Sequence, residues 1–526
     1  MKRFTLALAA MALALTASAQ WNVDNNPVLL SGTELGQIQP KVALTKDGKM
    51  YIAWRTHKST GKALCYSYPH LQLLDKDGNA LFGENGLAVS DHRSPSWNSD
   101  YSLAVTSDGS AIISNADSRS EEAEDLERYN TFTPVWYKID QSQNFVWGLD
   151  GLALNDRINS PFTDTYVVGD DVWILDRTNS YSDVNYSNRV SPEGTLAFTE
   201  SQDIFGQIFP SIGTDFLVIN AGSNGPEAIR YTRDCNKVWG DPAVLGSSNS
   251  GGHDLHPYKI DADGKGGAFV TWVRNVGDFG HMITSQHVTA DGSVEFGLES
   301  MDVMSNEDYD VDYPQQASDT KNNTALVAFA YSLGDGAYNF SVQKFNATGD
   351  RLFGDTGKII DSKTDDYAGW AFNNYGVLPV GDGEWLLCYS NVIAWASEDL
   401  YVTRIDKNGD VVWKQQIGQT GSFSEVNFVK GDNCSYVVYQ GEDDDSNTML
   451  KGARIFDDGT FNEGTGINIV NDNLSDVTST TIHSIDGKVI KSIDGNDFNS
   501  TNFAPGIYIV TVKDAQGRAK SVKIVK

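Results

Sequence analysis

The chain has 526 residues and carries 70 acidic against 40 basic side chains, a net charge of −30. Such a surface repels the phosphates of nucleic acids and of anionic membranes, so neither is expected as a partner. The 12 Trp, 22 Tyr and 23 Phe residues are more aromatic residues than disordered chains contain, so the chain is expected to fold.

The first 19 residues have the three parts of a secretory signal peptide. Lys2 and Arg3 give a positively charged start, Phe4 to Leu15 is an apolar run, and Ala17-Ser18-Ala19 is a small-residue cleavage site. The apolar run is too short to span a membrane, and no other segment is long enough, so no transmembrane segment is expected. We expect residues 1–19 to be removed and the protein to lie outside the cell or on its outer surface.

Between Gly36 and about Val470 the chain repeats a unit of about 54 residues, a length typical of repeat architectures. One half of the unit is a turn and a short strand, with an aromatic residue four positions after the turn glycine. Seven copies keep the aromatic residue, namely Phe82, Trp147, Phe198, Trp239, Phe296, Phe353 and Trp413. Gln143 and Cys235 replace the glycine in two of these copies, and an eighth copy around Gly459 shifts its aromatic residue to Phe461.

The other half of the unit is a continuous apolar run of five to eight residues, typical of a strand buried on both faces. The eight runs end at Trp54, Asn115, Asp176, Asn220, Trp272, Tyr331, Ser390 and Gln440. With one strand before each run and one after it, a unit holds about four strands. Four-stranded units predict an all-β fold, a β-propeller of about eight blades over residues 20–470, with seven blades as the alternative count.

Two segments carry a resemblance to a known family of repeats. Asn346–Gly357 (NATGDRLFGDTG) and Lys46–Trp54 (KDGKMYIAW) resemble the delta-sixty repeats of bacterial surface proteins, in which a DGxxDxxFGxxG half alternates with a PDGKIVVAG half. The resemblance implies a repeat fold rather than an activity. A right-handed β-solenoid is the alternative architecture, although the long and variable unit suits it poorly.

The last blade can be completed in two ways. Asn26–Gly32 (NPVLLSG) resembles the last strand of a unit, and so does Gly466–Asn471 (GINIVN). The sequence leaves both segments open as the closing strand.

A proline precedes the first strand of several repeats, at Pro40, Pro161, Pro210, Pro257 and Pro314. If these segments are equivalent, their neighbours gather around the central channel at one end of the ring. Aromatic, amide and imidazole side chains there would form a ligand-binding concavity, or would only plug the channel. The residues expected at this end are Gln37, Gln39, Trp97, Phe209, His253, His256, Tyr313, Gln315 and Trp370.

An acidic segment is the candidate cation site. Asp308, Asp310 and Asp312 alternate along an extended stretch, so their carboxylates share one face, and oxygen-rich clusters suit Ca²⁺. A solvated acidic loop is the alternative, and no other cofactor is expected. The D-x-D-G sequences that begin at Asp75 and Asp261 are explained as hairpin turns, in which glycine supplies a positive φ.

Histidine and cysteine add little chemistry. His253 and His256 point to opposite faces of an extended segment, which favours hydrogen bonding or packing over a shared metal. Cys388 and Cys434 lie in apolar runs and are expected to be buried as small hydrophobic residues. The sequence has no G-x-S-x-G, no H-E-x-x-H, no P-loop and no pair of C-x-x-C elements.

After a polar linker at residues 471–477, residues 478–526 form a second, small β-domain. Three short strand-like runs, Thr481–Ile485, Ile507–Val512 and Ser521–Val525, are separated by Asp- and Gly-containing turns. SIDGKVI, APGIYIVTV and the basic KIVK resemble the C-terminal sorting domain of type IX secretion substrates in Bacteroidetes. The resemblance implies a β-sandwich-like fold, the type IX secretion machinery as a partner, and removal of the tail after export.

These features favour a secreted or surface-displayed propeller that binds a glycan or a protein at one end of its ring. An extracellular hydrolase or lyase acting on polysaccharide is the alternative, because a glycosidase needs only two well-placed carboxylates, which no motif announces. Two carboxylates about 5 to 10 Å apart at a central cleft would favour the hydrolase. An aromatic and amide floor without them would favour binding.

Overall fold

The protein is all-β in the part of the chain that the structure describes. The computed structural model describes residues 21–525 apart from 24–25, 31–35, 60–64, 96–98, 120–131, 158–159, 179–183, 223–224, 247–257, 278–279, 307–308, 335, 364–370, 395–396, 422–424, 443–447, 462–476, 485–487, 495–506 and 515–518. Every regular element in these residues is a strand, and none is a helix that could cross a membrane. The predicted signal peptide lies outside the described residues.

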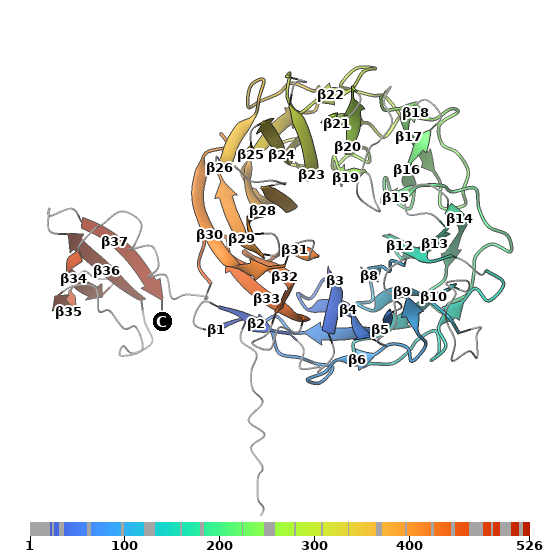
Figure 1. The fold of residues 1–526 in the computed structure, drawn as a ribbon, viewed down its shortest axis with the longest axis horizontal. Coiled ribbons are helices and arrows are strands. Elements are labelled where there is room, and N and C mark those ends of the chain that lie inside the picture. Colours follow the sequence, from blue (N-terminus) through green and yellow to red (C-terminus); the bar gives the residue numbers. More distant parts are fainter. Residues whose placement is uncertain are drawn as a thin grey trace, which may run out of the picture.

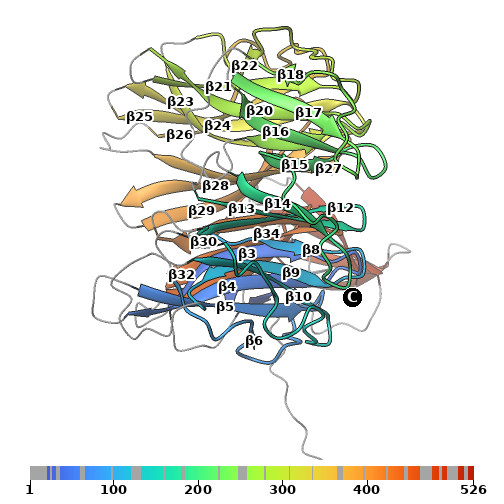
Figure 2. The ribbon, with the colours of Figure 1, turned by 90° about the vertical axis from the view of Figure 1, so that its right-hand side faces the viewer.

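Eight antiparallel sheets follow one another around a ring, in a propeller-like arrangement (Figures 1 and 2). The first sheet contains β3 (Gly36–Leu44), β4 (Met50–Ser59), β5 (Cys65–Leu74), β6 (Leu87–Ala88) and β7 (Ser94–Pro95). The second contains β8 (Leu103–Val105), β9 (Ala111–Asp117), β10 (Thr133–Ile139) and β11 (Leu152–Ala153). The third has three strands, β12 (Phe162–Val168), β13 (Asp171–Arg177) and β14 (Val184–Val190).

The next four sheets have four strands each. They contain β15 (Gln207–Pro210), β16 (Phe216–Gly222), β17 (Gly225–Tyr231) and β18 (Ala243–Val244); β19 (Lys259–Ala262), β20 (Ala268–Val276), β21 (Gly280–Val288) and β22 (Met301–Asp302); β23 (Asp310–Asp319), β24 (Thr324–Gly334), β25 (Ala337–Asn346) and β26 (Lys358–Lys363); and β27 (Phe372–Gly381), β28 (Glu384–Ala394), β29 (Ser397–Ile405) and β30 (Val411–Thr420). The eighth sheet joins β31 (Val426–Gly431), β32 (Cys434–Glu442) and β33 (Thr448–Phe456) to β1 (Asn22–Val23) and β2 (Asn26–Leu29).

The N-terminal strand closes the ring. In β2, Val28 pairs with Gly452 and Leu29 with Lys451 of β33, and the Leu30 N–H donates to the Leu450 carbonyl at 3.0 Å. Of the two segments that could complete the last sheet, the N-terminal one therefore does so, and Gly466–Asn471 lies outside the described residues. A ring sealed by its own first strand argues against the solenoid alternative.

Neighbouring sheets pack face to face through apolar side chains. Trp173 of the third sheet lies 4.7 Å from Phe216 of the fourth, measured between ring centroids, and clusters of this kind recur around the ring. The predicted burial of Cys388 and Cys434 is confirmed. Of the seven repeat aromatics, Phe82, Trp239 and Phe296 are buried, and the other four are half-buried.

The C-terminal residues form a separate four-stranded sheet in the order β35-β34-β36-β37. Its strands are β34 (Val477–Ser484), β35 (Val489–Asp494), β36 (Ile507–Asp514) and β37 (Ala519–Val525). The three predicted runs fall within β34, β36 and β37 to within a residue, whereas β35 was not predicted. Within the described tail residues there is one antiparallel sheet rather than the two layers of a sandwich.

Candidate functional site

The inner strands of the first and sixth sheets contain the same unusual turn at their fourth residue. Gln39 and Tyr313 adopt left-handed φ angles of 55° and 56°, each directly before a proline, and each strand shifts its pairing register there. Ser160 and Phe209 also precede prolines, but neither is among the residues with positive φ. The equivalence of all the proline segments, on which the expected ring-end site depends, stays a prediction.

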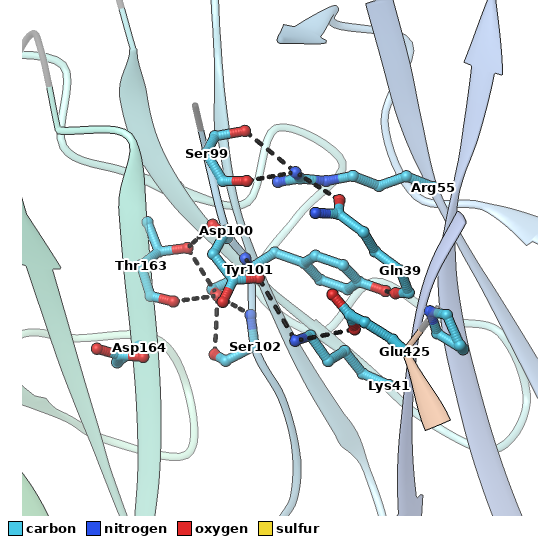
Figure 3. Close-up of polar contacts among 12 residues, drawn as sticks. Gln39, Lys41, Arg55, Ser99, Asp100, Tyr101, Ser102, Thr163, Asp164 and Glu425 are labelled. Carbon is cyan, nitrogen blue, oxygen red and sulfur yellow. Dashed lines mark hydrogen bonds and ion pairs between the residues drawn. The ribbon is translucent and has the colours of Figure 1, made fainter. Parts of the chain in front are cut away.

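Three charged side chains meet beside this turn of the first sheet (Figure 3). The Lys41 Nζ lies 3.5 Å from Oδ1 of Asp100, three residues before β8 of the second sheet, and 3.4 Å from Oε2 of Glu425, which directly precedes β31 of the eighth sheet. The second and eighth sheets flank the first on opposite sides, so an ammonium group that contacts both carboxylates lies on the central side of β3. We call Lys41, Asp100 and Glu425 the central cluster.

Buried polar contacts hold the central cluster in place. The fully buried Arg55 donates to the carbonyl and hydroxyl oxygens of Ser99, both at 3.0 Å, and to Gln39 Oε1 at 3.1 Å. Its guanidinium lies 4.8 Å from the ring centroid of Tyr101, and the Tyr101 hydroxyl donates to the Gln39 carbonyl. The turn at Gln39, one of the predicted ring-end residues, is thus held by Arg55 and Tyr101 beside the central cluster.

The charges of the central cluster depend on one another. Burial opposes the charge of Lys41, but Asp100 and Glu425 outweigh it and raise the pKa of this ammonium well above its usual value. Burial raises the pKa of Glu425, against the opposing effect of Lys41. The Glu425 side chain nevertheless keeps 38% of its surface exposed, compared with 12% for Asp100. Glu425 is therefore the carboxylate of the pair that a ligand can reach.

The predicted site residues that the structure describes have mixed roles. Gln37 is fully buried and accepts the Leu450 N–H at 3.0 Å, so it supports ring closure and faces no ligand. Phe209 packs against the hydrophobic core of the fourth sheet. Tyr313 is half-buried, and burial raises the pKa of its hydroxyl to about 12. Gln315 donates to the Asn374 carbonyl at 3.3 Å. Other predicted residues lie outside the described chain, namely Trp97, His253, His256 and Trp370.

The predicted calcium ligands are only partly described, because Asp308 lies in a gap. His281 Nδ1 lies 3.4 Å from Asp310 Oδ1 and 3.6 Å from Asp312 Oδ2, and the Tyr313 N–H donates to Asp312 at 2.8 Å. Among the described residues no group of three or more His, Cys, Asp or Glu side chains has the geometry of a metal site. Calcium binding stays a prediction.

Sequence reasoning missed the central cluster. Lys41 is two residues beyond the predicted Gln39, and Asp100 and Glu425 occupy the corresponding start of the inner strand in their own units. An alignment of the eight inner-strand starts would have placed the three side chains at one end of the ring. The signal was the position in the repeat, since no motif links the three residues.

Comparison with known proteins gives no family. No protein-family model matches the sequence, and no curated protein matches it. The chain is similar in structure to a eukaryotic initiation factor (8% identity, 90% of each chain, TM-score 0.37). It is also similar to an endo-arabinase from Bacteroides thetaiotaomicron (11% identity, 73% of this chain and 98% of that one, TM-score 0.27) and to a mannose phosphorylase from Leishmania mexicana (10%, 75% and 92%, 0.28). With TM-scores below 0.5, these likenesses carry no argument about function.

Proposed function

We propose that this chain is an eight-bladed β-propeller that binds an extracellular glycan or protein at the end of the ring where the central cluster lies. The observation that carries the proposal is the ammonium of Lys41, shared by two carboxylates that come from both neighbouring sheets. Half-buried Gln39, Tyr313 and Gln315 at the inner-strand starts supply the amide and aromatic groups of such a site.

Binding suits the central cluster because its charges are already paired. Lys41 compensates both carboxylates, and the buried Arg55 fixes the turn beside them, so the groups are held before a ligand arrives. A ligand with hydroxyl or amide groups can bond to the exposed oxygen of Glu425 without separating the ion pairs. Preorganisation of this kind raises affinity by lowering the entropy that is lost on binding.

The test is a glycan array and a pull-down of extracellular proteins with the chain lacking residues 1–19. Glu425→Gln and Tyr313→Ala should each weaken binding to whatever the parent retains by about tenfold, the effect of one lost contact of 1.4 kcal/mol. Lys358→Met, which removes an ammonium at the far exposed edge of the sixth sheet, is the control. Unchanged binding by both site variants would contradict the proposal.

A hydrolase is the second candidate, and one observation favours it. Asp100 and Glu425 contact the same ammonium, so their oxygens lie at most about 7 Å apart, a limit compatible with the carboxylate pair of a glycosidase. The raised pKa of Glu425 would suit a general acid. Release of reducing ends from a polysaccharide panel, lost in Glu425→Gln and in Asp100→Asn, would establish this activity in place of simple binding.

We also propose export. The signal-peptide pattern of residues 1–19 and the likeness of residues 478–526 to type IX sorting domains support a route to the outer surface or the medium. Deletion of residues 476–526 should leave a folded ring in the periplasm, and normally exported protein should lack the tail. Mass spectrometry that finds intact Lys526 on exported protein would contradict the processing step.

A further inference from the structure

A second cavity lies away from the central cluster, where the third and fourth sheets meet. It encloses about 360 Å³ and is lined by Asp203, Phe205, Val218, Asn220, Glu227, Ile229, Tyr231, Lys237 and Pro242. Its floor is the face of β16 and β17 on which Val218 pairs with Ile229 and Asn220 with Glu227. Phe216, on the same face, packs against Trp173 of the third sheet, so the cavity opens on the side of the fourth sheet that faces the third.

The cavity follows from an irregularity of the third sheet, which has three strands where its neighbours have four. In place of a fourth strand, Gln202 donates its N–H to the Ser187 carbonyl at 3.0 Å and the chain then crosses to the fourth sheet. Ile204 is buried during this crossing, with only 1% of its surface exposed. In an extended segment its neighbours Asp203 and Phe205 point the other way, and both line the cavity.

Four polar side chains line the cavity without bonding to other described residues. Within the described part of the chain, no hydrogen bond or ion pair to protein engages the side chains of Asp203, Asn220, Glu227 and Lys237. Glu227 and Asn220 are half-buried, whereas Asp203 and Lys237 are exposed. Gly222 leaves space for the Glu227 side chain, because a Cβ at position 222 would lie 2.1 Å from Glu227 Cδ.

The lining identifies the class of ligand. Phe205 leaves 45% of its surface exposed at the rim, which offers an apolar face for stacking. A purely apolar ligand would bury the carboxylates, amide and ammonium without partners, at a cost of about 1–3 kcal/mol for each group. An anion would meet two carboxylates in a chain of net charge −30.

We infer that this cavity binds a neutral sugar residue of a glycan. The hydroxyl groups of a sugar both donate and accept, so they match carboxylates that accept and an amide and ammonium that donate. The C–H face of the same ring stacks on Phe205. A volume of about 360 Å³ is at the lower end of the range of small-molecule sites and suits one or two such residues. This site is separate from the central cluster and does not depend on its function.

The test is isothermal titration of the chain lacking residues 1–19 with neutral hexaoses of glucose, xylose, mannose and arabinose. At least one should bind, and Phe205→Ala and Glu227→Gln should each weaken that binding at least tenfold. Gly222→Ala should weaken it as well, because its methyl group displaces the Glu227 carboxylate. Leu298→Ala, which removes a side chain that is 78% exposed on the fifth sheet, should bind as the parent does.

Two further measurements separate this cavity from the central cluster. Glu425→Gln should leave the affinity of the cavity unchanged, and Phe205→Ala should leave binding at the central cluster unchanged. The inference is overturned if no neutral hexaose binds, or if Phe205→Ala and Glu227→Gln retain the affinity of the parent.

Discussion

Trp239 packs on Gly292, the turn glycine of the following repeat. A Cβ at Gly292 would lie 3.0 Å from the ring carbon Cδ2 of Trp239, and the indole N–H donates to the carbonyl of Ala290 in the same turn at 3.1 Å. The relationship recurs around the ring, between Trp147 and Gly194, Phe296 and Gly349, Phe353 and Gly409, and Trp413 and Gly459. The repeat motif is therefore a contact between successive sheets, in which each aromatic residue packs on the next turn.

This contact predicts different costs for two glycine substitutions in one repeat. Gly292 and Gly297 have similar φ angles of 90° and 85°, but a Cβ at Gly297 would have no neighbour within 4 Å. Both alanine variants take on the strain of positive φ, about 1–2 kcal/mol, and only Gly292→Ala also displaces Trp239. We expect Gly292→Ala to be less stable by about 1 kcal/mol than Gly297→Ala in urea unfolding. Equal stabilities would contradict the role of the contact.

The sequence predicted the repeat because its signals are local. A turn residue with positive φ and an aromatic residue four positions later are read within one segment, and Gln143 and Cys235 keep φ angles of 68° and 62° at two turns that lack glycine. The competing closing strands were also identified from sequence, and pairing of Val28 with Gly452 decides between them.

The central cluster could not be predicted in this way. Lys41 faces Asp100 and Glu425 only because β3 shifts its register between Ile38 and Lys41, and a shift of one residue sends side chains to the opposite face. That shift coincides with the left-handed turn at Gln39, whose side-chain and backbone oxygens accept hydrogen bonds from Arg55 and Tyr101, residues distant from it in the sequence.

Because Tyr313 has a left-handed backbone conformation, we expect two substitutions at this position to differ in stability. Asparagine tolerates positive φ, whereas a β-branched residue does not. Tyr313→Asn and Tyr313→Val lose the same ring, so the difference between them reports the backbone. We expect Tyr313→Val to be less stable by about 1–2 kcal/mol in urea unfolding. At Phe209, whose φ is not positive, the same pair of substitutions should show no penalty for valine, and a penalty there would contradict the explanation.

Replacement of the Asp261 carboxyl by a neutral group should stabilise the protein at neutral pH. Burial raises the pKa of this carboxyl from 3.8 to about 6, although the Ser318 N–H donates to it at 2.8 Å. A carboxyl with a raised pKa stabilises the fold fully below its ordinary pKa, and this stability is lost as the pH rises through about 6. The other carboxylate oxygen accepts the Ala262 N–H at 3.0 Å, so Asp261→Asn removes the charge but keeps an oxygen acceptor for only one of the two N–H groups. We expect it to exceed the parent by about 1 kcal/mol at pH 8 and to be no more stable than the parent at pH 4.

If the difference in stability between Asp261→Asn and the parent is the same at pH 4 and pH 8, Asp261 does not titrate between these values. The measurement is urea unfolding across the pH range, with Asp291→Asn as the control. Asp291 is an exposed turn residue whose pKa is lowered by a hydrogen bond from Thr289. Its replacement should therefore not raise stability at pH 8.

Removal of the Lys41 ammonium should destabilise the protein most at neutral pH. Burial raises the pKa of Glu425 and Lys41 lowers it, so Lys41→Met should raise that pKa further. The stability linked to a raised carboxyl pKa is present below the ordinary value and is lost as the pH rises through the folded value. We expect Lys41→Met to lower the free energy of unfolding by about 2 kcal/mol at pH 7.5 and by about 0.5 kcal/mol or less at pH 4. The loss at pH 7.5 is smaller than for a fully buried pair, because Glu425 is part-exposed.

Urea unfolding at the two values of pH measures both costs. Lys41→Arg keeps the charge and should remain within about 1 kcal/mol of the parent, and Lys358→Met, in an exposed pair with Asp410, should change little at either pH. An equal cost of Lys41→Met at both values of pH would mean that the ammonium does not compensate the charge of Glu425, and the central cluster would then lose the electrostatic basis of its proposed role.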